Sequence, residues 1–193
     1  PIGVYSFNGN KLLSTSGGGM VVTNNDKLAT YMKFLSTQAK DNKPFYHHTE
    51  IGYNYRMSNV LAAIGVAQME VIEDRIKRTR EINKMYRKEL SDLFYSFQEE
   101  RESDRSNMWL TCALMKGEDM PRDLIAHLEK DNIEARRIWK PMHEQPIMQD
   151  YKKYINGNSS LLFLQGICLP SGSDLTNKDM KRIIKSIKTF FKK

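Results

Sequence analysis

The sequence predicts an α/β protein in two pieces, the last part of a larger α/β domain followed by a small α+β domain. Two short apolar runs near the start flank a loop of small residues, which is typical of two strands joined by a tight loop. Apolar residues then recur at helical spacing over residues 58–93. From about residue 94 onward, predicted strands and helices alternate. We therefore expect residues 1–75 to belong to the larger domain, and residues 76–193 to hold the rest of the long helix and the small domain.

The first elements are two strands and a helix. Residues 4–7 and 20–22 are apolar runs of the length of short strands. An asparagine at position 24 or 25 can cap a helix that runs to about residue 35. Residues 36–56 are polar and rich in aromatic side chains, so we expect a loop there.

The apolar period that begins at Ser58 predicts one long helix, or two helices in series. Residues 99–106 contain no apolar side chain, and we expect an exposed loop inside the second piece. Residues 108–115 then read as a strand.

The last third of the chain contains two predicted helices and two extended segments. Asp119 followed by Pro121 predicts a helix start, because a proline in the first turn needs no N–H partner, and this helix should run to about residue 130. Residues 133–139 and 161–168 are expected to be strands or extended segments. Thr176 and Asp179 have the spacing of a capping box that opens the terminal helix.

The composition allows a sizeable core and favours anionic partners. A chain of 193 residues with 40% hydrophobic content can bury a core. Thirty Lys and Arg residues against 23 Asp and Glu give a net charge of +7, which favours nucleotides, phosphosugars or nucleic acid as ligands. The alternative is that the excess charge lies on solvated helix surfaces. The prediction of a nucleic-acid-binding domain would depend on charge alone, since the sequence has no RNA- or DNA-binding motif.

Other features of the composition exclude several classes of protein. No apolar run approaches the roughly 18 residues of a membrane span. Cys112 and Cys168 lie in apolar runs without CxxC spacing, so we expect buried thiols and a reducing, cytoplasmic location. The four histidines lack HExxH spacing, and no metal site is expected.

The start of the chain suggests that more sequence precedes it. The first residue is Pro1 rather than methionine, and the most informative motif lies within the first twenty positions. We therefore expect the chain to be a piece of a longer protein.

That motif is a lysine between small residues. Lys11 follows Ser6 by five positions and precedes three glycines at 17–19. A lysine that attacks an aldehyde must lose its proton readily, which a desolvated site near other positive groups promotes. A serine hydroxyl and the backbone N–H groups of small residues can bind a phosphate. The alternative is a surface lysine beside a glycine turn.

Four motifs in order along the chain resemble one family. The segment Ser-Phe-Asn-Gly-Asn-Lys at 6–11 is similar to the lysine signature of the DegT/DnrJ/EryC1/StrS family of pyridoxal-phosphate (PLP) dependent sugar aminotransferases. Gly-Tyr-Asn-Tyr-Arg-Met-Ser-Asn at 52–59, Trp-Lys-Pro-Met-His at 139–143 and Cys-Leu-Pro-Ser-Gly at 168–172 resemble its later motifs. The resemblance implies PLP-dependent transferase fold type I, like aspartate aminotransferase, with the C-terminal part of the PLP-binding large domain and the small α+β domain present.

The resemblance also implies a role for each matched residue. Lys11 would bind the cofactor covalently and later accept and donate a proton. Ser6 would bind the cofactor phosphate, and Asn54 would reach the cofactor of a neighbouring subunit, which implies a homodimer with a shared active site. Arg56 would lie near anionic groups of substrate or cofactor, although an ion pair at the start of the long helix is the alternative.

The late motif implies substrate contacts. Trp139, Lys140 and His143 resemble a region near the nucleotide-sugar site, although His143 could equally be structural. His47 and His48 lie in the predicted loop before the second motif, and we expect them near the sugar.

The implied reaction transfers an amino group, from glutamate, to a nucleoside-diphosphate keto-sugar, in amino-sugar and surface-polysaccharide biosynthesis. Members with histidine in place of the lysine run a PLP-dependent dehydration, but position 11 is lysine here. A sugar dehydratase is therefore one alternative, and a catalytically inactive dimerisation module is the other. The expected partner of the pyridine nitrogen would precede Pro1, so this piece alone should be nearly inactive.

Overall fold

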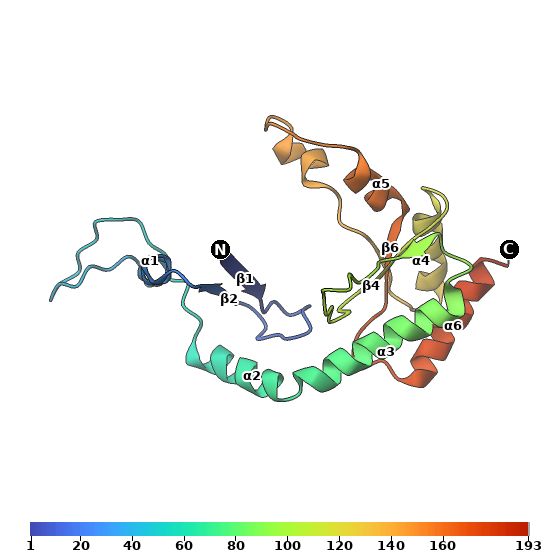
Figure 1. Ribbon diagram of the computed structural model, residues 1–193, viewed down its shortest axis with the longest axis horizontal. Coiled ribbons are helices and arrows are strands. Elements are labelled where there is room, and N and C mark those ends of the chain that lie inside the picture. Colours follow the sequence, from blue (N-terminus) through green and yellow to red (C-terminus); the bar gives the residue numbers. More distant parts are fainter. Residues whose placement is uncertain (193) are drawn as a thin grey trace. The chain divides into compact units, whose positions relative to one another are not determined.

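The computed structural model describes residues 1–192, which form two compact units, residues 1–73 and 74–192. Figure 1 shows the order of the elements along the chain. No helix in the described part of the chain combines the length and the apolar character needed to cross a membrane.

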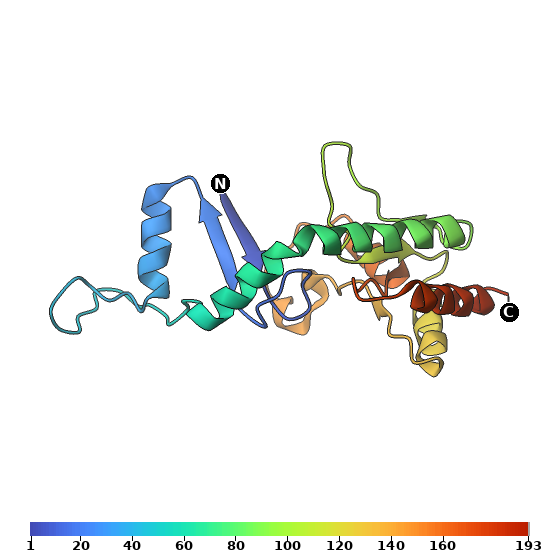
Figure 2. The ribbon, with the colours of Figure 1, turned by 90° about the horizontal axis from the view of Figure 1, so that it is seen from below.

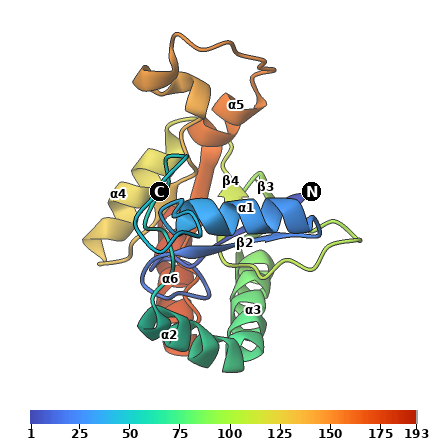
Figure 3. The same cartoon turned by 90° about the vertical axis from the view of Figure 1, so that its left-hand side faces the viewer.

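The first unit begins with a β-hairpin and a helix. Strands β1 (Ile2–Ser6) and β2 (Gly19–Thr23) pair antiparallel, with Ser6 opposite Gly19. Helix α1 (Asp26–Ser36) lies beside β2, as Figures 2 and 3 show. The side chain of Asn25 caps this helix by accepting a hydrogen bond from the Leu28 N–H at 3.1 Å. The predicted strands and the predicted asparagine cap are thus confirmed.

Residues 37–57 form the predicted loop, with one isolated bridge between Thr37 and Asn54. Gly52 allows two parts of this loop to approach closely. A Cβ atom at position 52 would lie only 2.2 Å from the backbone nitrogen of Ala39, so a side chain cannot be placed there without moving the backbone.

The long apolar period forms two helices in series, α2 (Asn59–Glu70) and α3 (Ile72–Leu90). Ser58 caps α2, because its side chain accepts a hydrogen bond from the Leu61 N–H at 3.3 Å. This confirms the second of the two predicted possibilities, two helices in series rather than one long helix.

The second unit is built on a four-stranded antiparallel sheet in the order β3-β4-β6-β5. These strands are β3 (Ser96–Phe97), β4 (Thr111–Leu114), β5 (Arg136–Arg137) and β6 (Gly166–Leu169). Two more helices, α4 (Met120–Lys130) and α6 (Asn177–Phe190), contact each other. Together with α3 and the sheet they form one hydrophobic core. Its buried members are Ile82, Tyr86, Leu90, Phe94, Phe97, Ala113, Met115, Leu124, Leu128, Ile133, Ala135, Ile167, Leu169, Met180, Ile183, Ile184 and Ile187.

Both predicted helix starts in this unit are confirmed. Pro121 lies in the first turn of α4. Thr176 and Asp179 form the full capping box of α6, in which each side chain accepts a hydrogen bond from the backbone N–H of the other residue. The Thr176 hydroxyl, which donates to Asp179 Oδ2 at 2.5 Å, and then the Thr176 N–H hold the pKa of Asp179 below its ordinary value.

One predicted strand is wrong in its first half. Residues Asn158–Gln165 form helix α5, and only Gly166–Leu169 continues as strand β6. A short apolar run has no period that separates a strand from a helix. The left-handed Gly157, at φ 84°, starts the helical turn here, and the Asn156 side chain accepts a hydrogen bond from the Asn158 N–H.

The other predicted strands are shorter than expected, and two 3-10 turns follow β5, at Met142–Glu144 and Pro146–Met148.

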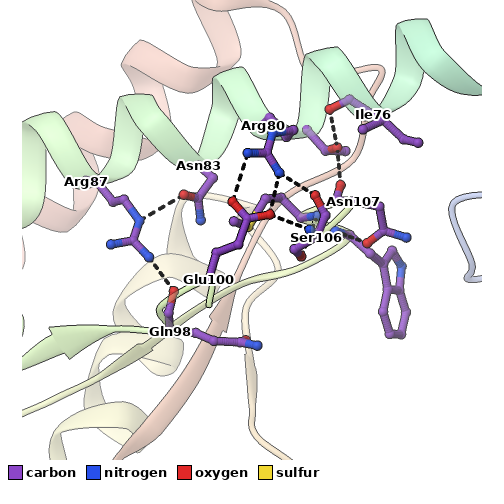
Figure 4. Close-up of polar contacts among 11 residues, drawn as sticks. Ile76, Arg80, Asn83, Arg87, Gln98, Glu100, Ser106 and Asn107 are labelled. Carbon is purple, nitrogen blue, oxygen red and sulfur yellow. Dashed lines mark hydrogen bonds and ion pairs between the residues drawn. The ribbon is translucent and has the colours of Figure 1, made fainter. Parts of the chain in front are cut away.

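Residues 99–106 form a loop, as predicted, but Glu100 in this loop is half-buried. It forms a two-point ion pair with Arg80 of α3, which Figure 4 shows. The two N···O distances are 2.8 and 2.9 Å.

Candidate active site

Lys11 lies in the loop of the β1–β2 hairpin. The loop closes through backbone hydrogen bonds from the Phe7 N–H to the Gly18 carbonyl at 3.0 Å and from the Thr15 N–H to the Phe7 carbonyl at 2.9 Å. Thr15 is fully buried and donates its hydroxyl to the Gly17 carbonyl at 2.5 Å. The loop therefore has a fixed conformation rather than an open turn.

The buried threonine also connects the loop to α2. A Cβ atom at Gly65 would lie 3.0 Å from the methyl group of Thr15, so the glycine lets the helix pack closely on the loop. Gly18 has φ 88°, a conformation that side chains rarely adopt. The glycine at position 18 is therefore set by backbone geometry.

Ser6 and Lys11 lie at the two sides of a short turn. Ser6 ends β1, and its hydroxyl accepts a hydrogen bond from the Asn8 N–H at 3.4 Å. The Lys11 N–H donates to the Asn8 carbonyl at 3.0 Å, and the Lys11 side chain is half-buried. A hydroxyl and a primary amine in one hairpin suit a ligand that carries a phosphate and an aldehyde. These residues therefore fit the phosphate and aldehyde ends of PLP.

Asn54 and Arg56 lie on one extended segment of the same unit. The segment is fixed to the end of α1 by hydrogen bonds from the Tyr53 N–H to the Leu35 carbonyl at 2.8 Å and from the Tyr55 N–H to the Ser36 carbonyl at 3.0 Å. The rings of Tyr53 and Tyr55 stack with centroids 5.0 Å apart.

Because side chains alternate along an extended segment, Asn54 points away from the face that holds both tyrosines. Arg56 is exposed and forms no ion pair with residues 1–192. The alternative of an ion pair at the start of the helix is therefore not supported, and the guanidinium of Arg56 can bind an anion.

His47 and His48 bind their own loop. His47 Nδ1 lies 2.7 Å from Asp41 Oδ2, and this contact lowers the pKa of Asp41. His48 Nδ1 lies 3.0 Å from the Gln38 carbonyl oxygen. Both rings thus hold the loop together through Nδ1.

Trp139 and Lys140 follow β5 in the second unit, and both are exposed. The ring of Trp139 lies 6.2 Å from the ring of Trp109, centroid to centroid. Both tryptophans line a cavity of about 270 Å³ in this unit. The other lining residues are Asn83, Gln98, Glu99, Glu100, Ser106, Asn107, Met108, Leu110 and Cys112.

His143 is held by two neighbours that the sequence motif did not indicate. Its Nε2 lies 3.4 Å from the hydroxyl of Ser160 on α5 and 3.7 Å from Glu144 Oε1. Ser160 donates its hydroxyl to the same carboxylate oxygen at 2.5 Å. Only 19% of the His143 side chain is exposed, and this network holds the ring in place.

The structure thus groups the predicted residues by unit. Ser6 and Lys11 share one loop, Asn54 and Arg56 share one segment of the same unit, and the remaining three lie after β5 in the second unit. Within residues 1–192 there is no cluster of three or more histidine, cysteine, aspartate or glutamate side chains suited to a metal ion.

The sequence model of the DegT/DnrJ/EryC1/StrS aminotransferase family matches residues 1–188. Over 98% of its length the chain is 40% identical to a candidate pyridoxal phosphate-dependent aminotransferase, EpsN, of Bacillus subtilis (strain 168). It is 36% identical, again over 98% of its length, to the GDP-perosamine synthase of Escherichia coli O157:H7. The chain spans about half the length of these curated relatives, 50% and 52%.

The fold agrees with solved structures of this family. The crystal structure of a DegT DnrJ EryC1 StrS aminotransferase from Brucella abortus matches all of the chain with a TM-score of 0.88 and 26% identity, and the chain covers 51% of it. The α/β architecture predicted from the sequence is therefore that of about half of a PLP-dependent sugar aminotransferase.

Proposed function

Because the chain belongs to the DegT/DnrJ/EryC1/StrS aminotransferase family, we propose that its protein transfers an amino group from glutamate to a nucleoside-diphosphate keto-sugar, with PLP as cofactor and Lys11 as the catalytic residue. The activity belongs to the intact protein, meaning this chain with any residues that accompany it. The names of EpsN and of the GDP-perosamine synthase support the cofactor and the nucleotide-sugar substrate respectively.

The observation that carries the proposal is the position of Lys11 in the closed hairpin loop. Lys11 is half-buried and lies on the same short turn as Ser6, between two paired strands. A surface lysine beside a flexible glycine turn would lack both the fixed loop and the neighbouring hydroxyl.

Each of the other residues has a role consistent with its position. Ser6 donates its hydroxyl to the cofactor phosphate, and Asn54 contributes to the site of a second copy in a homodimer. Arg56 and Lys140 are exposed cations suited to the diphosphate of the substrate.

Trp139 offers an aromatic face, and the imidazole of His143 can bind hydroxyl groups of the sugar. When bound, PLP supplies the electron sink that makes a proton on the donor carbon acidic. The Lys11 amine is then the group that holds and returns that proton.

The first test compares the intact protein with its Lys11→Ala variant after both are incubated with PLP. The native protein should show the visible absorption band of a lysine-bound cofactor, and the variant should lack it. Lys27→Ala, which removes an exposed lysine of α1, is the matched control and should keep the band.

A second measurement separates the alternative functions. Glutamate and a nucleoside-diphosphate 4-keto-sugar are incubated with the native protein, and the sugar product is identified by mass spectrometry. Aminated sugar is the expected product, whereas loss of water from the sugar would indicate a dehydratase. If the intact protein neither acquired the band nor aminated any keto-sugar, the aminotransferase proposal would be wrong.

A further inference from the structure

The two cysteines of the chain face each other across two neighbouring strands. Cys112 of β4 is paired in register with Cys168 of β6, and their Sγ atoms are 3.6 Å apart. Both are free thiols. They lie outside the hydrophobic core cluster, whereas Ala113, Ile167 and Leu169 belong to it, so the two thiols lie on the sheet face opposite the core.

The register places the pair where a disulfide can form. The Met115 N–H donates to the Gln165 carbonyl at 2.8 Å, which makes this opposing pair hydrogen-bonded. Because hydrogen-bonded and non-hydrogen-bonded pairs alternate, Cys112 and Cys168 form a non-hydrogen-bonded pair, with Cα atoms about 4.5 Å apart. Disulfides span Cα distances of about 4.4–6.8 Å. Bond formation therefore requires rotation of the side chains and little movement of the backbone.

The two thiols differ in access. Cys112 is partly exposed and lines the cavity of about 270 Å³ that also contains Trp109 and Trp139. Cys168 is buried, with 7% of its surface exposed. A small oxidant can thus reach Cys112 through the cavity, while Cys168 lies behind it.

The thiols also differ in reactivity. The hydrogen bond with Cys168 lowers the pKa of Cys112, whereas the same contact and burial raise the pKa of Cys168. Since the thiolate is the nucleophile, Cys112 is the thiol that reacts first.

We propose that Cys112 and Cys168 are a site of reversible oxidation, in which a peroxide converts the pair to a cross-strand disulfide. The Cys112 thiolate attacks one oxygen of hydrogen peroxide, the O–O bond breaks, hydroxide leaves and Cys112 becomes a sulfenic acid. The Cys168 sulfur then attacks the Cys112 sulfur, the S–O bond breaks, and water leaves with the Cys168 proton. The two sulfurs lose two electrons in total, and the peroxide is reduced to water. A dithiol reverses the reaction by thiol–disulfide exchange.

The oxidised bond would join β4 to β6, the two strands at the centre of the sheet. Residue 112 and residue 168 are 56 positions apart in sequence, so the disulfide would close a long loop that contains α4, β5 and α5. This loop also carries Trp139, Lys140 and His143. The oxidation state of the pair would thus affect the segment that holds the proposed substrate contacts, but the inference does not depend on the proposed function.

The test is peptide mapping of the intact protein. The protein is treated with hydrogen peroxide, free thiols are blocked with iodoacetamide, and the product is digested with trypsin without reductant. The expected result is a linked pair of tryptic peptides, residues 106–116 joined to residues 154–178, lighter by two hydrogen atoms than the sum of the free peptides. Dithiothreitol should release both. Recovery of both peptides as alkylated thiols, or of Cys112 as sulfinic acid without the linked pair, would overturn the proposal.

Two variants test the order of the steps. In Cys168→Ser the sulfenic acid has no partner, so dimedone should label Cys112. In Cys112→Ser, Cys168 should remain unlabelled at the same peroxide concentration. Preferential labelling of Cys168 would contradict the assignment of Cys112 as the attacking thiol. The mapping of the native protein needs no variant and therefore stands even if one of the serine proteins folds poorly.

Discussion

Ser6 is the residue at which the proposed phosphate contact can be tested alone, because it ends β1 and its hydroxyl faces the turn that leads to Lys11. The Ser6→Ala variant removes one hydroxyl. A hydrogen bond to a charged group contributes about 1.5–3 kcal/mol, so the dissociation constant for PLP should rise about 10- to 100-fold. Titration of the cofactor-free intact protein with PLP, followed by absorbance, measures the change.

Ser16→Ala is the matched control, since Ser16 is exposed in the same loop. Its dissociation constant should stay close to that of the native protein. An unchanged constant in Ser6→Ala would remove Ser6 from the phosphate site. Equal losses of affinity for PLP in both variants would show that the loss arises from a changed loop conformation rather than from the missing Ser6 hydroxyl.

Gly52 gives a prediction about stability. The Gly52→Ala variant adds a Cβ atom that would lie 2.2 Å from the Ala39 nitrogen, so the backbone must shift. Overpacking of this kind costs about 1–3 kcal/mol, and the midpoint of urea denaturation of the intact protein should fall accordingly. Gly17→Ala is the control, because a Cβ there meets no atom within 4 Å. A midpoint unchanged in Gly52→Ala would show that the loop yields without cost.

At the scale of residues, the sequence could predict functional side chains that lie close together along the chain. Ser6 and Lys11 are such a pair, because only one turn of the loop separates them. The partners of His143 show the limit. Ser160 reaches it from 17 positions away, on the helix α5 that the sequence did not predict, so no local pattern could place that hydroxyl next to the ring.

At the scale of elements, the 99–106 loop shows how an exposed segment is fixed by charge. Glu100 binds Arg80 at two points and accepts a hydrogen bond from the Ser106 N–H, while Arg80 donates to the Ser106 carbonyl at 2.5 Å (Figure 4). Arg87, two turns further along α3, donates to the Gln98 carbonyl at the start of the loop. A single helix thus holds both ends of the loop.

This arrangement predicts a dependence of stability on pH. Arg80 first, and then the Ser106 N–H, lower the pKa of Glu100 to about 2 from its ordinary value of 4.5. The folded state favours the carboxylate form of Glu100. The contribution of this carboxylate to the free energy of unfolding is therefore fully present above about pH 4.5 and is lost as the pH falls toward 2. The Glu100→Gln variant should therefore lose less stability than the native protein over this range. Urea denaturation of the intact protein at several pH values measures the slope.

Glu102→Gln is the control for that experiment, because Glu102 is an exposed carboxylate of the same loop. Its stability should follow the native slope. Identical slopes in all three proteins would mean that the Arg80–Glu100 pair does not persist in solution.

Elements were predictable where their ends are set by local chemistry. Asn25, Pro121 and Thr176 each begin a helix at the expected position, because caps act within one turn. Strands were less predictable, since a strand ends where its partner ends. β5 keeps only Arg136–Arg137 of the expected residues 133–139, because only these two pair with β6.

At the scale of the whole molecule, the two units differ in how much they bury. Every member of the hydrophobic core cluster lies between residues 82 and 187, in the second unit. In the first unit both strands and α2 expose large apolar side chains, such as Val4 at 76% and Val60 at 67%. Exposed apolar surface of this extent marks an interface with other protein. About half of the length of the relatives lies outside the match, which is consistent with a further segment that covers this surface.

The overall fold class could be predicted because four motifs occur in the family's order, and motif order does not depend on packing. The distribution of buried surface could not be predicted in the same way. The apolar runs of β2 and of β6 look alike in sequence, yet Val21 is 48% exposed and Ile167 is fully buried. Only the neighbouring elements decide which run is covered.

This difference predicts uneven protection in the chain when it is studied by itself. Regions with few buried apolar contacts open at low free energy, whereas core elements open only near global unfolding. In hydrogen exchange of residues 1–193 alone, backbone amides of β1, β2 and α2 should exchange rapidly, and those of β4, β6 and α6 slowly. In the intact protein, the amides of the first unit should become protected while those of the second change little. Equal protection of β1 and β2 in both samples would show that the hairpin is stable without a further segment, and that its apolar face is an exposed surface of the folded protein.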